Sequence, residues 1–173
     1  IDANVLIDKD GSKYLYYSRD CSENVGSDGI HRSEIYGVRL RDDLLATEGG
    51  ESRLLTPEQD WELVSGNPLW NEGPEMIAYK GNYLSYSANC FADGSYSLGY
   101  AVATNPLGPF VKAEENPILS SYFRTDVSGT GHHSFTWSPD DTELWVVYHS
   151  HTDPAQGGGD RKVNMDRAGF SKE

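Results

Sequence analysis

The stretch NYLSYS at residues 82–87 is rich in tyrosine and small polar residues, and it occurs twice more in the chain in a related form. The related stretches are KYLYYS at 13–18 and ELWVVYH at 143–149. When Tyr17, Tyr86 and Tyr148 are aligned, the steps between them are 69 and 62 residues. A period near this length fits a unit of four strands with their loops. The three stretches therefore predict a repeated all-β fold.

Each repeated unit is expected to contain the same order of strands. Turn signals such as Asp10-Gly11 and Asp93-Gly94 separate short aromatic and β-branched runs, and helical periodicity is almost absent. Further strands are expected at 34–40, 97–104, 110–119 and 161–170. The predicted fold class is all-β, a β-propeller of which this chain holds about three blades, at 1–62, 63–125 and 126–173. The other interpretation is an open β-sandwich whose aromatic strands are alike by chance.

The repeat count and the first residue both point to further sequence. Propellers usually have four to eight blades, so three units do not close a ring comfortably. The chain opens at Ile1, without an initiator Met, and runs directly into a strand-like segment. We therefore expect either a processed leader or a longer polypeptide.

The overall charge argues against two classes of partner. Lys and Arg total 14 and Asp and Glu total 27, which gives a formal net charge of −13 and a pI near 4.6. Such a charge repels the phosphates of nucleic acids and anionic membranes. No run of apolar residues approaches the roughly 18 that a membrane span needs. We expect neither a nucleic acid nor a membrane as a partner.

Ionisable residues occupy equivalent positions in the three units. Counted back from the aligned tyrosine of each unit, Asp2 lies at 15 residues, Glu72 at 14, and His132 and His133 at 16 and 15. In a propeller the first strand of each blade lines the central channel, so these side chains are expected to face one cavity. Two carboxyl groups in one cavity suit glycosidic bond cleavage, which needs one protonated acid and one ionised carboxylate. Taken alone, each of these residues is more often a solvated charge or part of a polar turn, and the shared position in the repeat is what favours a site.

The motif WNEGPEM at 70–76 holds two glutamates. Trp70 lies two residues before Glu72, so both are expected on one face of a strand. Trp70 then offers either a stacking surface for a sugar ring or packing between blades. Glu75, at odd spacing from Glu72, is expected to face the other side.

Four motifs together resemble glycoside hydrolase family 43, the five-bladed β-propeller enzymes that act on arabinose- and xylose-containing polysaccharides. They are IDANVLIDKDGSKYLYYS at 1–18, NEGPEM at 71–76, LGYAVATNPLGPF at 98–110 and GTGHHSFTWSPDDTELWVVYHSH at 129–151. The resemblance covers nearly the whole chain and corresponds to roughly the last three of five blades.

The resemblance implies a role for each matching position. Glu72 matches the general acid, and Asp2 matches the aspartate that tunes the pKa of this acid and orients it. His132 matches a histidine near the propeller axis that contributes to substrate binding and often helps to hold calcium or another hydrated cation. Arg161 matches an arginine of the last blade that reaches the sugar. No organic cofactor is implied.

One member of the family's catalytic set has no counterpart in the chain. The general base belongs to the first blade, upstream of Ile1, and Asp8, Asp10 and Asp20 lie in a strand-turn or a loop. We therefore expect these 173 residues alone to be inactive, with the missing blades supplied by upstream sequence or a partner fragment. The implied function is an inverting glycosidase that cleaves arabinofuranosyl or xylosyl linkages of plant cell-wall arabinan or arabinoxylan, in an extracellular location.

Several alternatives stay open at this point. The motifs do not separate an arabinofuranosidase from a xylosidase or an arabinanase. A non-catalytic carbohydrate-binding propeller is the alternative function, and a protein-interaction propeller is disfavoured by the equivalent acidic residues. Cys21 and Cys90, each four residues after an aligned tyrosine, are compatible with a disulfide or with two free thiols.

Overall fold

The computed structural model describes residues 1–170, which contain eleven β-strands and one 3-10 helix. The strands are β1 (Asn4–Ile7), β2 (Lys13–Arg19), β3 (Arg32–Leu40), β4 (Thr47–Leu55), β5 (Leu69–Ala78), β6 (Asn82–Ala88), β7 (Ser97–Ala103), β8 (Val111–Lys112), β9 (Gly131–Trp137), β10 (Leu144–His151) and β11 (Arg161–Ala168). The 3-10 helix η1 spans Asp60–Glu62. Within the described residues, no helix has the length and apolar character that a membrane crossing needs.

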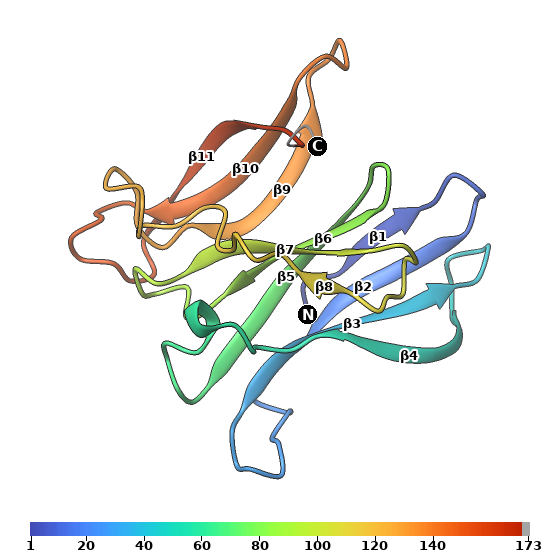
Figure 1. Cartoon of the computed structure of the whole chain (residues 1–173), viewed down its shortest axis with the longest axis horizontal. Coiled ribbons are helices and arrows are strands. Elements are labelled where there is room, and N and C mark those ends of the chain that lie inside the picture. Colours follow the sequence, from blue (N-terminus) through green and yellow to red (C-terminus); the bar gives the residue numbers. More distant parts are fainter. Residues whose placement is uncertain (171–173) are drawn as a thin grey trace.

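The strands form three antiparallel meanders in chain order, as Figure 1 shows. The first meander contains β1 to β4, the second β5 to β8, and the third β9 to β11. A short parallel pairing of Arg32 and Ser33 with Leu69 and Trp70 joins the first two meanders into one eight-stranded sheet. The third meander is a separate three-stranded sheet.

The all-β prediction is confirmed, with one strand shorter than expected. The segment predicted as a strand at 110–119 pairs with β7 only at Val111 and Lys112. The chain then turns, with the N–H of Asn116 donating to the carbonyl of Ala113 over 3.4 Å, and Leu119 returns to an isolated bridge with Leu98. The division into three blades of a propeller stays a prediction, and residues 171–173 of its third unit lie outside the described residues.

The first strands of successive meanders lie side by side. The backbone N–H of Met76 in β5 donates to Oδ1 of Asn4 in β1 over 3.1 Å. The N–H of Phe135 in β9 donates to Oε2 of Glu75 in β5 over 2.8 Å. A backbone N–H at the edge of a sheet needs a hydrogen-bond acceptor. Here the side chains of Asn4 and Glu75 accept the edge N–H groups of the next meander. This arrangement places the start of β1 beside β5, and β5 beside β9.

Two buried hydrophobic clusters lie between the meanders. The first joins the first two meanders through Tyr16, Ile35, Leu55, Met76, Leu84, Tyr86, Ala88 and Ala101. The second joins the second and third through Leu98, Leu119, Val146 and Tyr148. Tyr86 and Tyr148 are therefore core residues, whereas the aligned Tyr17 is half-buried and stacks on Tyr36. The repeated strand thus carries its tyrosine into the core in only two of its three copies.

A buried ion pair holds η1 against the start of β5. The ammonium group of Lys112 lies 2.7 Å from both carboxylate oxygens of Glu62 and 3.0 Å from Oδ1 of Asn71. Glu62 is fully buried and also accepts the backbone N–H groups of Glu58 and Gln59, each over 2.8 Å. A buried charge pair is tolerable when its remaining hydrogen-bonding capacity is satisfied, as here. The cluster fixes Asn71, the residue directly before the predicted general acid.

Candidate active site

A β-bulge in β5 sets the directions of the two glutamates in WNEGPEM. Glu72 pairs with Ser87 and Glu75 pairs with Ser85, and the register shifts between them. Gly73, inside the bulge, has a φ of +57°, which glycine adopts at little cost. Paired residues share a face of an antiparallel sheet, and Ser85 and Ser87 are two residues apart, so both glutamates lie on one face. The prediction that Glu75 faces the other side is wrong, because it assumed an uninterrupted two-residue period.

Glu72 has the electrostatic environment of a proton donor. Burial raises the pKa of Glu72 to about 7; a hydrogen bond from Tyr96 opposes this rise, and the charge of Asp2 adds to it. The hydroxyl of Tyr96 donates to Oε1 of Glu72 over 2.8 Å. A carboxylic acid with a pKa near 7 keeps a large protonated fraction at neutral pH. The side chain is therefore able to give a proton where an ordinary glutamate is ionised.

Asp2 lies beside Glu72 although it comes from another meander. Its Oδ2 accepts the backbone N–H of Gly73 over 3.2 Å and the hydroxyl of Ser18 over 3.3 Å. Asp2 has a φ of +57°, a left-handed conformation that costs a non-glycine residue on the order of 1 kcal/mol or more. The surrounding contacts hold this conformation and keep the carboxylate next to the bulge.

The two adjacent histidines have different surroundings. Nε2 of His132 lies 3.9 Å from Oδ1 of Asp2, and its backbone N–H donates to Oγ of Ser87 over 2.8 Å. His133 is buried, with Nε2 2.6 Å from Oγ of Ser85, and burial lowers its pKa to about 3. The structure thus brings His132 to Asp2 and the bulge, while His133 belongs to the core.

The described residues do not gather a cluster of metal-ligating side chains around His132. Calcium takes about six to eight oxygen ligands in proteins. Within residues 1–170, no three or more His, Cys, Asp or Glu side chains gather in a way that could hold a metal ion. His132 and Asp2 are only two such groups, so the cation expected near His132 stays a prediction.

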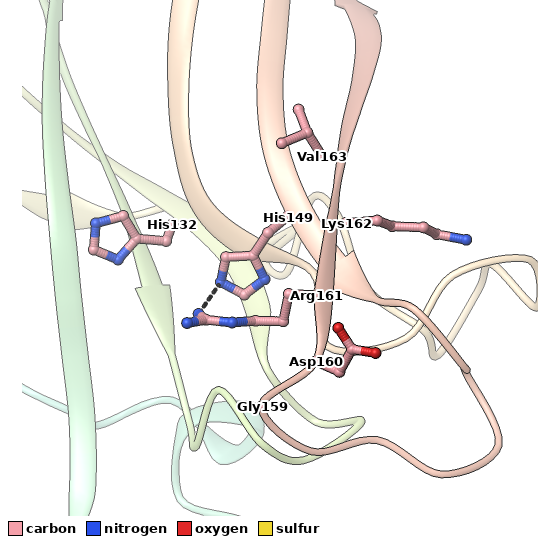
Figure 2. Close-up of a pocket in the computed structure, with 7 residues that line it drawn as sticks. All are labelled: His132, His149, Gly159, Asp160, Arg161, Lys162 and Val163. Atoms are coloured by element: carbon pink, nitrogen blue, oxygen red, sulfur yellow. Dashed lines mark hydrogen bonds between the residues drawn. The ribbon is translucent and has the colours of Figure 1, made fainter.

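Arg161 and His149 form one side of a pocket of about 540 Å³, shown in Figure 2. The pocket is lined by His132, His149, Gly159, Asp160, Arg161, Lys162 and Val163. Nη1 of Arg161 lies 3.0 Å from Nε2 of His149, and its guanidinium carbon lies 4.8 Å from the ring centre of Phe91. The positive charge of Arg161 also acts to lower the pKa of Glu72, against the larger effect of burial.

Trp70, the remaining predicted site residue, lies outside the pocket lining. Trp70 precedes Glu72 by two residues on β5 and is half-buried, and it is not among the residues that line the pocket. Asp160 does line the pocket, but its carboxylate points to the opposite side from the guanidinium of Arg161 (Figure 2).

Cys21 and Cys90, for which a disulfide and two free thiols were both open, are free thiols in the structure.

Tyr96 and His149 are contacts of the site that the repeat did not single out. Tyr96 lies directly before β7 and is fully buried, and its ring stacks on that of His149 at 5.5 Å between centres. Gly131 makes room for it, since a Cβ at that position would lie 2.3 Å from the Tyr96 ring. For Tyr96 the sequence signal was indirect, a glycine in the GTGHH turn of the third unit.

A buried acid with a raised pKa, a second carboxylate and an arginine beside a pocket are typical of enzymes that cleave glycosidic bonds. The family model for glycosyl hydrolases family 43 matches residues 1–172, so this chain belongs to that family. The fold agrees with this assignment. A solved structure of a thermostable family-43 glycoside hydrolase is 51% identical, with a TM-score of 0.94 over 99% of this chain and 55% of that chain.

Two curated relatives show how the chain relates to enzymes of known activity. It is 34% identical to an extracellular exo-alpha-(1->5)-L-arabinofuranosidase of Streptomyces chartreusis, over 81% of this chain and 42% of the relative. It is 29% identical to a beta-D-galactofuranosidase of Aspergillus niger, over 86% of this chain and 36% of the relative. The chain therefore spans less than half the length of either relative.

Proposed function

We propose that this chain carries the proton-donor half of an inverting glycosidase site that cleaves arabinofuranosyl or xylosyl linkages in plant cell-wall arabinan or arabinoxylan. The observation that carries the proposal is the position of Glu72, whose Oε1 accepts the hydroxyl of Tyr96 and whose neighbour Gly73 is hydrogen-bonded to Asp2. Burial raises the pKa of Glu72 in this position to about 7. Glu72 is the general acid, and Asp2 orients it and raises its pKa. The general base is supplied from outside residues 1–173.

In the proposed reaction, Glu72 gives its proton to the glycosidic oxygen as the bond from this oxygen to the anomeric carbon breaks. A water molecule attacks the opposite face of the sugar and loses a proton to the general base. Inverting enzymes keep the two carboxyl groups about 6.5–9.5 Å apart, which leaves room for this water. Arg161 and His132, which line the pocket, contact the sugar, and Trp70 offers it a stacking surface.

Asp8, Asp10 and Asp20, the aspartates nearest the start of the chain after Asp2, are poor candidates for the base. Asp8 and Asp10 lie in the turn between β1 and β2, where they accept backbone N–H groups of Lys9 and Ser12. Asp20 accepts the N–H of Ser22 over 2.9 Å in a loop turn. These bonds describe turn-forming carboxylates, which supports a base that lies elsewhere.

The proposed substrate class follows from relatives and not from the pocket alone. The Streptomyces chartreusis relative is named as an exo-acting, extracellular arabinofuranosidase, and a relative in Bacteroides ovatus is named as a xylosidase/arabinosidase. An extracellular location and a pentose-containing polysaccharide are proposed for this protein by the same similarity. The choice between the two sugars is left to the assay.

The test compares Glu72→Gln with Glu75→Gln in the full-length polypeptide that carries this chain. Hydrolysis of arabinofuranosyl and xylosyl substrates is expected to fall roughly 10²–10⁴-fold in Glu72→Gln, because the acid is lost while the shape is kept. Glu75→Gln is the matched control, since Glu75 lies on the same strand face but binds Ser134 and Phe135. Equal activity of Glu72→Gln and wild type would show that another group donates the proton.

A non-catalytic carbohydrate-binding protein is the second candidate, favoured by the absence of a convincing base within the described residues. The same full-length polypeptide distinguishes the two functions. Binding of arabino- or xylo-oligosaccharides without release of sugar supports the binding protein, whereas measurable release supports the glycosidase. Residues 1–173 alone are expected to release none.

A further inference from the structure

We propose that Tyr96 and His149 are a pair of positioning residues that hold the carboxyl group of Glu72 and the guanidinium group of Arg161 in a fixed relation. In this pair, the hydroxyl of Tyr96 donates a hydrogen bond to Oε1 of Glu72, so that the acid donates its proton from Oε2. The inference rests on the proposed function, because it assumes that Glu72 is the general acid.

The first step is the bond from Tyr96 to Glu72. The Tyr96 side chain is fully buried, and its hydroxyl lies 2.8 Å from Oε1 of Glu72. Burial and the neighbouring carboxyl of Glu72 raise the pKa of Tyr96 well above its ordinary value, so the hydroxyl keeps its proton and acts as the donor. The ring is confined by the close approach of Gly131. Oε1 is therefore held by a rigid donor.

The second step concerns which oxygen of Glu72 carries the transferable proton. A protonated carboxyl group has one O–H, and its other oxygen accepts hydrogen bonds. Since Tyr96 donates to Oε1, the proton resides on Oε2. Transfer then moves this proton from Oε2 to the glycosidic oxygen as the bond to the anomeric carbon breaks. The carboxylate that remains keeps its hydrogen bond from Tyr96.

The third step concerns His149, whose ring stacks on Tyr96 with 11° between the planes. Nη1 of Arg161 lies 3.0 Å from Nε2 of His149, and a guanidinium group only donates hydrogen bonds. Nε2 is therefore an acceptor, which makes His149 neutral with its proton on Nδ1. Burial and the adjacent charge of Arg161 lower the pKa of His149 to about 4, in agreement with this state. His149 thus holds Arg161 without adding charge.

The pair spans two meanders. Tyr96 precedes β7 of the second meander and His149 lies on β10 of the third, so the stacked rings connect the acid to the arginine across their junction. Other charged groups also act on Glu72: Asp2 and Asp20 raise its pKa, and Arg161 lowers it. Within residues 1–170, Tyr96 is the one residue that donates a hydrogen bond to an oxygen of the Glu72 carboxyl group.

Tyr96→Phe in the full-length polypeptide tests the bond to Glu72. Loss of a donor that favours the carboxylate raises the pKa of Glu72, so the alkaline limb of kcat/KM against pH should move to higher pH. The kcat should fall roughly fivefold, the rate equivalent of one hydrogen bond. Tyr16→Phe is the matched control, because Tyr16 is equally buried but its hydroxyl donates to the carbonyl of Pro106. The alkaline limb of the pH profile of Tyr16→Phe should stay where it is in the wild type.

Two further variants keep the test decisive if Tyr96→Phe does not fold. Replacement of Tyr96 by 3-fluorotyrosine keeps the shape of the ring and strengthens the donor, so the alkaline limb should move to lower pH. His149→Phe keeps a flat ring on Tyr96 and removes the acceptor for Arg161. It should raise KM several-fold and leave kcat within about twofold.

The outcomes separate this inference from the proposed function. A limb that stays in place in both Tyr96 variants, while Glu72→Gln is inactive, overturns the positioning of Glu72 and leaves the general acid intact. An unchanged KM in His149→Phe overturns the role of His149. Full activity of Glu72→Gln overturns the proposed function itself.

Discussion

The backbone N–H of Gly73 donates a hydrogen bond to Oδ2 of Asp2 over 3.2 Å, although the two residues are 71 positions apart in the chain. This bond joins the residue after the proposed acid to a carboxylate of the first meander. It depends on the left-handed conformations of both residues, each with a φ of +57°. The bulge in β5 therefore brings the second carboxylate to the acid.

Asp2→Asn is expected to lower the pKa of Glu72. The substitution removes a negative charge that raises this pKa, while the amide oxygen still accepts the N–H of Gly73. The alkaline limb of kcat/KM should move to lower pH, and activity at neutral pH should fall by roughly two- to tenfold. Asp10→Asn, in the exposed turn after β1, is the control. A limb that moves to higher pH would contradict the prediction.

Glu72 is expected to make stability depend on pH. Its folded pKa of about 7 lies above the ordinary 4.5, so its contribution to stability is fully present below pH 4.5 and is lost as pH rises through 7. Between pH 5 and pH 8 the wild type should lose on the order of 3 kcal/mol more unfolding free energy than Glu72→Gln. Urea unfolding at the two pH values measures this difference, and parallel losses in both proteins would rule out the raised pKa.

Gly131→Ala is expected to disturb Tyr96. The added Cβ would lie 2.3 Å from the ring of a fully buried side chain, and overpacking of this kind costs about 1–3 kcal/mol. Gly50→Ala, whose Cβ would meet no atom within 4 Å, should change stability by no more than about 0.5 kcal/mol. Thermal unfolding of both variants makes the comparison. Equal midpoints would show that the glycine is not needed for the ring.

Lys112→Met is expected to destabilise the protein by about 3–5 kcal/mol, because it leaves the fully buried carboxylate of Glu62 without its cation. The double variant Lys112→Met with Glu62→Gln removes both charges and should be more stable than the single variant. Chemical unfolding of the two proteins measures this order. If the double variant is the less stable one, the bonds from Glu62 to the backbone matter more than the charge balance.

Much of the fold was predictable from local patterns. The alternation of aromatic and polar residues and the Asp-Gly turns identify β-strands, because side-chain direction in a strand follows a period of two. The same period gave the wrong side-chain direction for Glu75, because a bulge at Gly73 interrupts it. This bulge depends on backbone conformation and on the pairing with β6. The predicted strand at 110–119 failed for a related reason, because the chain turns after Lys112.

The sequence by itself determined the all-β class, the repeat, and the equivalent positions of Asp2, Glu72 and the pair His132 and His133. Those features follow from the spacing and the types of the residues. Only the tertiary structure decided that His132 and not His133 reaches Asp2, that Tyr96 holds Glu72, and that His149 holds Arg161. The physical reason is that these contacts join strands of different meanders, so their geometry depends on how the sheets pack and not on any local pattern.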